Sequence, residues 1–319
     1  SKRPLVVDPE IVFATYSGSR SDNWGLTATY DEDGYGYTGG MVFADAFPNT
    51  AGAFQMNFAG GDTLCERCPD IARDGTLMRF SPDGSELMYA TYFGGSHNEQ
   101  PHSMVINSRN ELIVFGTTRS RDFPVLDGYD ETHNGQDDII VMRLDEQGRL
   151  LSSTYLGGSG ADGNNGSYSD GYDNNHALSA NYGDVYRGEV KVDEQDQVWI
   201  ATTTRSSPAD GFPLRNAFQG RLGGGYNDQD GCLIGLSEGL DNLVYSSYLG
   251  GSGLDAAYSL DIRPGTGEVV LTGGTTSRDF PTTEGAYQTS SRTQEGQDES
   301  IRAVDGWVAV VKTEQRLLA

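Results

Sequence analysis

The chain has 319 residues, with 46 acidic residues against 22 basic ones and a formal net charge of −24 at pH 7. So acidic a protein is repelled by nucleic acids and by anionic membranes, which disfavours both as partners. No apolar run has the length of a bilayer-spanning segment. We therefore expect a protein that neither binds nucleic acid nor inserts into a membrane.

One short pattern recurs four times and organises the chain. It is a strand that ends in a tyrosine and then turns at glycine. The copies are Thr15-Tyr16-Ser17-Gly18, Thr91-Tyr92-Phe93-Gly94, Thr154-Tyr155-Leu156-Gly157 and Ser247-Tyr248-Leu249-Gly250. Repeats that pack against their neighbours favour one cooperative unit over several unrelated domains.

Three further landmarks follow each copy in the same order. A Phe-Pro pair comes first, then an aromatic signature, then an Asp that opens a short apolar strand. The Phe-Pro pairs begin at Phe47, Phe123, Phe212 and Phe280; the aromatic residues are Phe54, Tyr129, Phe218 and Tyr287; the strand-opening residues are Asp74, Asp138, Asp230 and Asp305. An Asp in this position is suited to accept backbone N–H bonds and to hold the turn before the strand.

The connections between apolar runs have the composition of tight turns. Asp83-Gly84 and Glu146-Gln147-Gly148 are examples, and no stretch of a dozen residues shows helical periodicity. An all-β repeat with about four strands per unit predicts a β-propeller built of four-stranded antiparallel blades. We expect one propeller domain over 1–319, with repeats at approximately 11–88, 89–150, 151–244 and 245–319, as part of a longer secreted protein. Four repeats are visible, and the number of blades stays open.

A propeller hides its sheet edges when a strand from one end of the chain completes a blade begun at the other end. Ile11 to Tyr16 is equivalent to Leu151 to Tyr155, which directly follows an Asp-led strand. We therefore expect 11–16 to pair with Val308 to Lys312. The first residues read like the interior of a longer precursor, and the last residues stop where another Thr-Tyr-Leu strand is due.

These motifs resemble the SBBP family of bacterial β-propeller repeats. The resemblance extends from about Ile11 to Lys312, and its strongest part is Asp279-Phe280-Pro281 through Gln288. Two copies depart from it, with Ala46 and Gly211 in place of the Asp before Phe-Pro. The resemblance implies an exported protein, extracellular or displayed on the outer membrane, of the kind found in gliding bacteria with type IX secretion. It also implies a role as an adhesion, assembly or display module.

For an exported protein, Cys65 and Cys68 are a candidate disulfide that closes a short loop. A zinc site is the alternative, but it needs two further ligands and none lies nearby in the sequence. Cys232 falls in an Asp-led strand, and we expect a buried free thiol there.

A second candidate site lies in the inserted loop of the third repeat. Asp162, Asn164, Asp170 and Asp173 supply carboxylate and amide oxygens on a glycine-rich segment. Ca²⁺ takes six to eight such oxygens, so calcium is the candidate cofactor. Asn, Asp and Gly are also the residues that tight turns select, so a metal-free turn cluster is the alternative.

The same region is rich in tyrosine. Tyr168, Tyr172, Tyr182 and Tyr186 form a candidate binding loop for a surface protein or a glycan, and the alternative is that they anchor the loop to its sheet. Loops on a rigid scaffold often carry binding function.

Catalytic motifs are weak in this sequence. The histidines, His97, His102, His133 and His176, are scattered, and we expect His97 and His102 in a loop. The sequence therefore favours a non-enzymatic module whose partners are a surface protein, a glycan or copies of itself. Two alternatives stay open: a lyase or glycoside hydrolase acting at the central channel of the ring, and a self-assembling filament subunit.

Overall fold

A computed structural model describes residues 10–61, 72–165, 178, 184–224, 229–291 and 304–313. Over these ranges the chain has fifteen strands and two single-turn 3₁₀ helices, η1 (Asp184–Tyr186) and η2 (Pro208–Asp210). Neither helix has the length or hydropathy of a bilayer-spanning segment. The predicted all-β class is confirmed.

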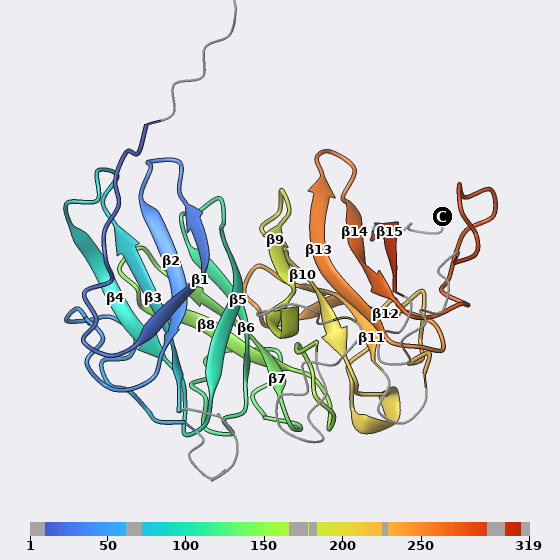
Figure 1. Cartoon of the computed structure of the whole chain (residues 1–319), viewed down its shortest axis with the longest axis horizontal. Helices are drawn as coiled ribbons and strands as arrows, with labels where there is room; N and C mark the ends of the chain where they lie inside the picture. Colours follow the sequence, from blue (N-terminus) through green and yellow to red (C-terminus); the bar gives the residue numbers. More distant parts are fainter. Residues whose placement is uncertain are drawn as a thin grey trace, which may run out of the picture.

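The strands form four antiparallel sheets, each a meander in chain order (Figure 1). The first sheet contains β1 (Asn23–Tyr30), β2 (Gly36–Val42), β3 (Asp74–Phe80) and β4 (Leu87–Phe93). The second contains β5 (Glu99–Ile106), β6 (Leu112–Thr118), β7 (Asp138–Leu144) and β8 (Leu150–Leu156). The third contains β9 (Glu189–Val192), β10 (Val198–Thr204), β11 (Asp230–Leu236) and β12 (Leu243–Leu249). In the described residues the fourth has three strands, β13 (Asp255–Arg263), β14 (Glu268–Thr275) and β15 (Asp305–Lys312).

The sheets are offset from the sequence repeat by one strand. The Thr-Tyr segment that opens a repeat forms the last strand of the sheet before it, with Tyr92 in β4, Tyr155 in β8 and Tyr248 in β12. The glycine turn then leads to the first strand of the next sheet. The Asp-led strand is the third strand of every sheet.

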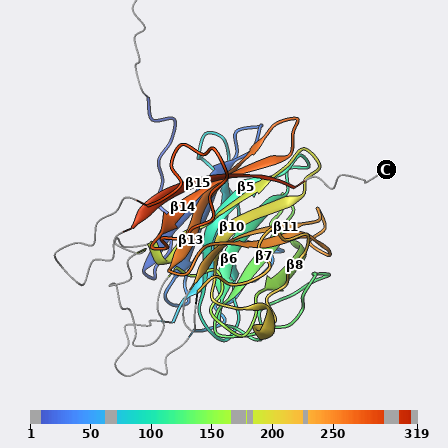
Figure 2. The same cartoon turned by 90° about the vertical axis from the view of Figure 1, so that its right-hand side faces the viewer.

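Consecutive sheets pack face to face. Strand β5 lies against the first sheet, β9 against β5 and β6, and β13 against β9, β10 and β11. Figure 1 shows the sheets in succession from blue to red, and Figure 2 views them from the side of the fourth sheet. Because an inner sheet is covered on both faces, its middle strands β6, β7, β10 and β11 are buried almost throughout. This explains why those segments read as nearly continuous runs of apolar and small residues.

An apolar cluster fills each junction between sheets. Each cluster takes side chains from the third strand of one sheet and from the next sheet. The pairs Leu77 and Met104, Val141 and Val190, and Leu233 and Leu260 represent the first, second and third junctions.

The repeated Tyr and the repeated Phe-Pro are partners in space. The ring centroids of Phe47 and Tyr92 lie 5.8 Å apart, those of Phe123 and Tyr155 6.0 Å, and those of Phe212 and Tyr248 5.1 Å. In the fourth sheet, Phe280 instead stacks on Trp307 of β15 at 5.1 Å. Aromatic pairs at these separations are favourable beyond the area they bury, so the two landmarks recur together.

The expectation that 11–16 closes a ring with β15 is wrong for this structure. Residues 11–16 form no strand, and Phe13 packs on Phe80 of the first sheet with ring centroids 6.4 Å apart. Among the described strands β15 pairs with β14 alone. The first sheet follows Phe13 directly in the sequence and offers its ring an apolar surface. This local contact holds residues 11–16 at the opposite end of the array from β15 (Figure 1).

Candidate functional site

Buried carboxyl groups stand at one end of the sheets, and the Asp-led strands provide the first set. The backbone N–H of Ala59 donates to Oδ2 of Asp74 over 2.6 Å, and that of Asn134 donates to Oδ2 of Asp138 over 2.7 Å. The N–H of Gly223 donates to Oδ2 of Asp230 over 2.8 Å. All three residues are buried. The predicted role of these residues in holding the preceding loop is confirmed.

A second set follows the glycine turn, at the start of or just before the next sheet. Glu99, Asp162 and Asp255 each lie four residues after the second glycine, and each accepts that glycine's N–H. Hydroxyl groups add further donors: Thr204 and Ser206 donate to Asp162, and Ser277 donates to Asp255. The spacing Gly-x-x-x-Asp/Glu is visible in the sequence and is the signal that sequence reasoning missed.

The two sets meet in pairs around a glycine. A Cβ added to Gly94 would lie 2.6 Å from Oε2 of Glu99 and 3.0 Å from Oδ1 of Asp74. Around Gly157 it would lie 2.7 Å from Oδ2 of Asp162 and 3.0 Å from Oδ1 of Asp138. We call these couples the acid pairs. A third couple, Asp230 and Asp255, surrounds Gly250 in the same way.

Burial governs the titration of these groups. Desolvation raises the pKa of Asp74 to about 7 and that of Asp138 to about 8, against lowering by their backbone N–H bonds. Desolvation also raises the pKa of Glu99 to about 8, with smaller lowering by Ser120 and Thr118. The side chains are fully buried, so a substrate does not reach them in this conformation.

The predicted calcium ligands fall into two groups. Asp162 and Asn164 are buried, and Asp162 already accepts bonds from Gly158, Thr204 and Ser206. Asp170 and Asp173 lie outside the described residues. Within the described ranges no three His, Cys, Asp or Glu side chains group in a way that holds a metal ion. Calcium binding by the inserted loop stays a prediction.

Of the four tyrosines in the predicted binding loop, only Tyr186 lies in the described residues. It belongs to η1, with its ring centroid 5.7 Å from that of His102, and Nη2 of Arg73 donates to its hydroxyl over 3.4 Å. Tyr168, Tyr172 and Tyr182 lie outside the described residues, as do Cys65 and Cys68. Tyr186 contacts the second sheet through His102, and its part in a binding loop stays a prediction.

His102 lies in β5, so its expected position in a loop is wrong. Its Nε2 lies 3.1 Å from Oγ1 of Thr117, which also accepts from Gln100 over 3.0 Å. Desolvation lowers the pKa of His102 to about 3, so the ring is neutral at physiological pH. A buried neutral imidazole held by a hydroxyl is a structural part of the sheet face. Cys232 is a buried free thiol, as predicted.

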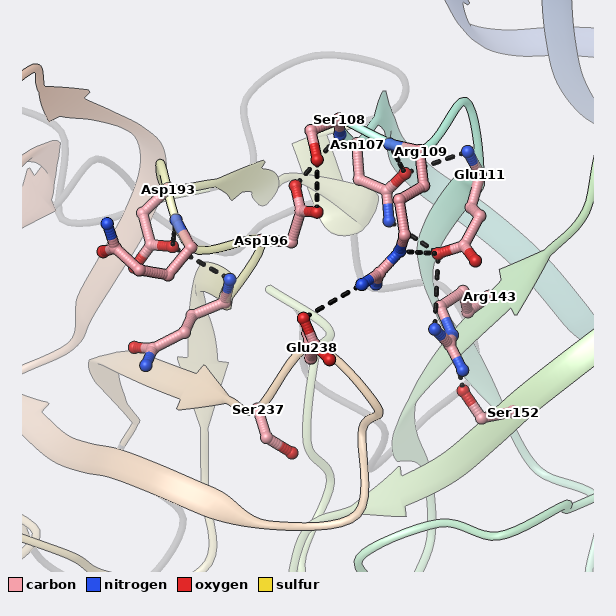
Figure 3. Close-up of polar contacts among 12 residues, drawn as sticks. Asn107, Ser108, Arg109, Glu111, Arg143, Ser152, Asp193, Asp196, Ser237 and Glu238 are labelled. Carbon is pink, nitrogen blue, oxygen red and sulfur yellow. Dashed lines mark hydrogen bonds and ion pairs between the residues drawn. The ribbon is translucent and has the colours of Figure 1, made fainter.

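The opposite ends of the sheets carry a network between hairpin turns (Figure 3). In it the N–H and Oγ of Ser108 donate to the carboxylate of Asp196 over 2.9 and 2.6 Å, joining the second sheet to the third. Arg109 also reaches Glu238 over 3.0 Å, an exposed ion pair of small energetic weight. These polar groups bind one another and link turns of the second and third sheets.

The described residues form an array of packed antiparallel sheets with buried acids at one end. Comparison with protein-family models gave no match, and neither did comparison with curated proteins. The resemblance to SBBP repeats therefore depends on the motifs in the chain itself.

Proposed function

We propose that this chain is a non-enzymatic, propeller-type module, exported and displayed outside the cell, that works by assembly through the exposed face of its fourth sheet. The four sheets are successive blades in this proposal. The proposal depends on one observation. Each of the first three sheets buries an apolar surface against the sheet that follows it, and the fourth sheet exposes the equivalent surface. We call this surface the trailing face; in the fourth sheet it contains Val308 and Val310 of β15.

The trailing face is defined by comparing equivalent strand positions. Val308 is the fourth residue of its Asp-led strand, as are Leu77, Val141 and Leu233 in theirs. Those three side chains are fully buried at the junctions, whereas Val308 is 72% exposed. Val310 is 51% exposed. The fourth sheet thus presents the half of a junction that normally meets another sheet.

The aromatic signature contacts the next sheet at two of the junctions. Phe54 packs against the first junction, and its N–H donates to the carbonyl of Gly148 in the next sheet over 2.9 Å. Tyr129 donates in the same way to Leu240 over 2.9 Å. Tyr287, the equivalent in the fourth sheet, is fully exposed. Phe218, at the third junction, is also 51% exposed, so the docking contact belongs to the first two junctions.

The apolar character of the trailing face indicates what kind of partner it binds. Covering a valine side chain contributes roughly 1.5 kcal/mol or more, so burial of this surface favours association. An apolar, flat sheet face fits an apolar protein face better than a glycan. We propose a second copy of the chain as the partner, bound through this face.

Light scattering coupled to size-exclusion chromatography over a range of protein concentrations tests this proposal. We expect the average mass to rise with concentration, and the double variant Val308→Asp/Val310→Asp to stay monomeric. Met88→Asp, a partly exposed apolar position on β4, is the matched control and should associate like the wild type. A wild-type protein that is monomeric at every concentration would overturn the proposed self-assembly.

A further inference from the structure

The acid pair at the first junction joins two sheets. Asp74 begins β3 in the first sheet, and Glu99 begins β5 in the second. Both side chains are fully buried, and both carboxyl groups approach Gly94 on the side where a side chain would stand. A side chain at this position would collide with both, so the glycine lets the carboxyl groups approach.

The hydrogen-bond donors around this pair are distributed unequally. Glu99 accepts from the N–H of Gly95 over 3.1 Å, from Thr118 over 2.5 Å and from Ser120. Asp74 uses Oδ2 for the N–H of Ala59. Its Oδ1, on the side of Glu99, is buried and receives no donor from the described residues. A buried acceptor without a donor is costly, and a proton on one of the two carboxyl groups would remove that cost.

Among the described residues, no positively charged side chain forms an ion pair with Asp74 or Glu99. Nε of Arg73 donates to Gln100 over 3.0 Å, which directs it to the neighbouring polar side chain. Asp122 accepts from Ser96, whose hydroxyl also lies 3.1 Å from Nδ1 of His97. Two full negative charges buried side by side repel each other strongly, and sharing one proton is the usual solution for such a dyad.

We propose that Asp74 and Glu99 share one proton between Oδ1 of Asp74 and Oε2 of Glu99, so that the junction between the first and second sheets is a pH-dependent lock. The proton makes one group a donor and the other an acceptor, which supplies the donor that Oδ1 lacks. Loss of that proton leaves two buried carboxylates side by side next to Gly94. The junction then opens more easily.

The direction of the pH effect follows from burial. The pKa is raised to about 7 for Asp74 and about 8 for Glu99, and the two groups titrate as a unit. A carboxyl group whose pKa is raised by folding stabilises the protein fully below its unfolded pKa near 4. That stability is lost as the pH rises through the folded values. The lock is closed in mild acid and weakens from neutral to alkaline pH.

Thermal unfolding between about pH 5.5 and about pH 8.5 tests the lock with Glu99→Gln and Asp74→Asn. Asp74→Asn supplies a permanent N–H donor toward Oε2 of Glu99, and either substitution removes one charge from the pair. We expect the wild-type midpoint to fall with pH and each variant to show a shallower fall. Glu86→Gln, at an exposed carboxyl group, is the control and should keep the wild-type slope. If one variant fails to fold, the other still decides the question.

Two results would overturn the lock. One is a wild-type slope preserved in both amide variants. The other is a midpoint at about pH 8 that added Ca²⁺ raises in the wild type and not in Glu99→Gln, which would assign the pair to a cation. Carboxyl carbon NMR of the wild type and of Asp74→Asn gives a direct reading, because a shared proton keeps a carboxyl signal of this pair in the protonated range at about pH 6.5 and the variant loses that signal. A fully ionised spectrum at that pH also contradicts the proposal.

Discussion

The phenol of Tyr155 donates a 2.8 Å hydrogen bond to the backbone carbonyl of Ser120. This bond joins the last strand of the second sheet to the loop that follows its second strand, and both groups are buried. Tyr248 makes the same bond to Ser206 over 2.8 Å in the third sheet. The repeated tyrosine is therefore conserved across the sheets for its hydroxyl as well as for its ring.

Tyr155→Phe tests the contribution of the hydroxyl. The ring still packs on Phe123, but the carbonyl of Ser120 loses a donor, so we expect the free energy of unfolding to drop by about 1–3 kcal/mol. Denaturant titration measures this drop. Tyr30→Phe, at an exposed tyrosine, should change it by less than about 0.5 kcal/mol. Equal stability of the two variants would show that the hydroxyl bond contributes nothing net.

Gly94→Ala tests the close approach of the first acid pair. The new Cβ would lie 2.6 Å from Oε2 of Glu99 and 2.9 Å from Cγ of Asp74, so the carboxyl groups must move apart. We expect a loss of about 1–3 kcal/mol in the free energy of unfolding, as for other overpacked sites. Gly25→Ala is the matched control, because a Cβ at Gly25 meets no atom within 4 Å. If Gly94→Ala left the free energy of unfolding unchanged, the two carboxyl groups would have enough space for an added Cβ.

His102 should not titrate in the physiological range. Its pKa is lowered to about 3, so its imidazole NMR signals should stay constant from about pH 8 to about pH 5. In the unfolded chain it binds a proton near pH 6.5, so its contribution to stability is lost as the pH falls below that value. The His102→Gln variant should therefore lose less free energy of unfolding than the wild type as the pH falls. The acid pairs have the opposite pH dependence, because their contribution is lost as the pH rises. Signals that shift with a midpoint near pH 6.5 would contradict the buried neutral ring.

The thiol of Cys232 should resist alkylation in the folded protein. Burial raises its pKa well above the usual value, and only the thiolate reacts. In a Cys65→Ser/Cys68→Ser background, we expect iodoacetamide labelling of Cys232 to require denaturant. Mass spectrometry after timed labelling measures this. Rapid labelling under native conditions would place Cys232 at an accessible site.

Predictions from the sequence were most successful for residues whose contacts lie close to them along the chain. Asp74, Asp138 and Asp230 hold the loops before their strands as predicted, because an Asp binding nearby N–H groups needs only a short segment of chain. Glu99 was missed, although its spacing from Gly95 is regular. Its importance comes from Asp74, which lies in another sheet, and the separation along the chain hides this contact.

The wrong prediction of ring closure also shows the limit of interpreting a segment from its local sequence. Ile11 to Tyr16 matches the last strand of a sheet in its sequence, yet Phe13 packs on Phe80 and the segment forms no strand. Local pattern describes what a segment is able to form. Which edge it reaches depends on where the sheets stand in space.

The amino-acid sequence by itself determined the all-β class, the repeated landmarks, the turns and the buried thiol, since each depends on residues close together in the chain. Only the tertiary structure decided that a repeat shares its strands between two sheets, that acids from neighbouring sheets meet around Gly94, and that Val308 lies exposed. These properties depend on the packing of one sheet on the next. Burial, which sets both the pKa of Glu99 and the exposure of Val308, is a property of that packing.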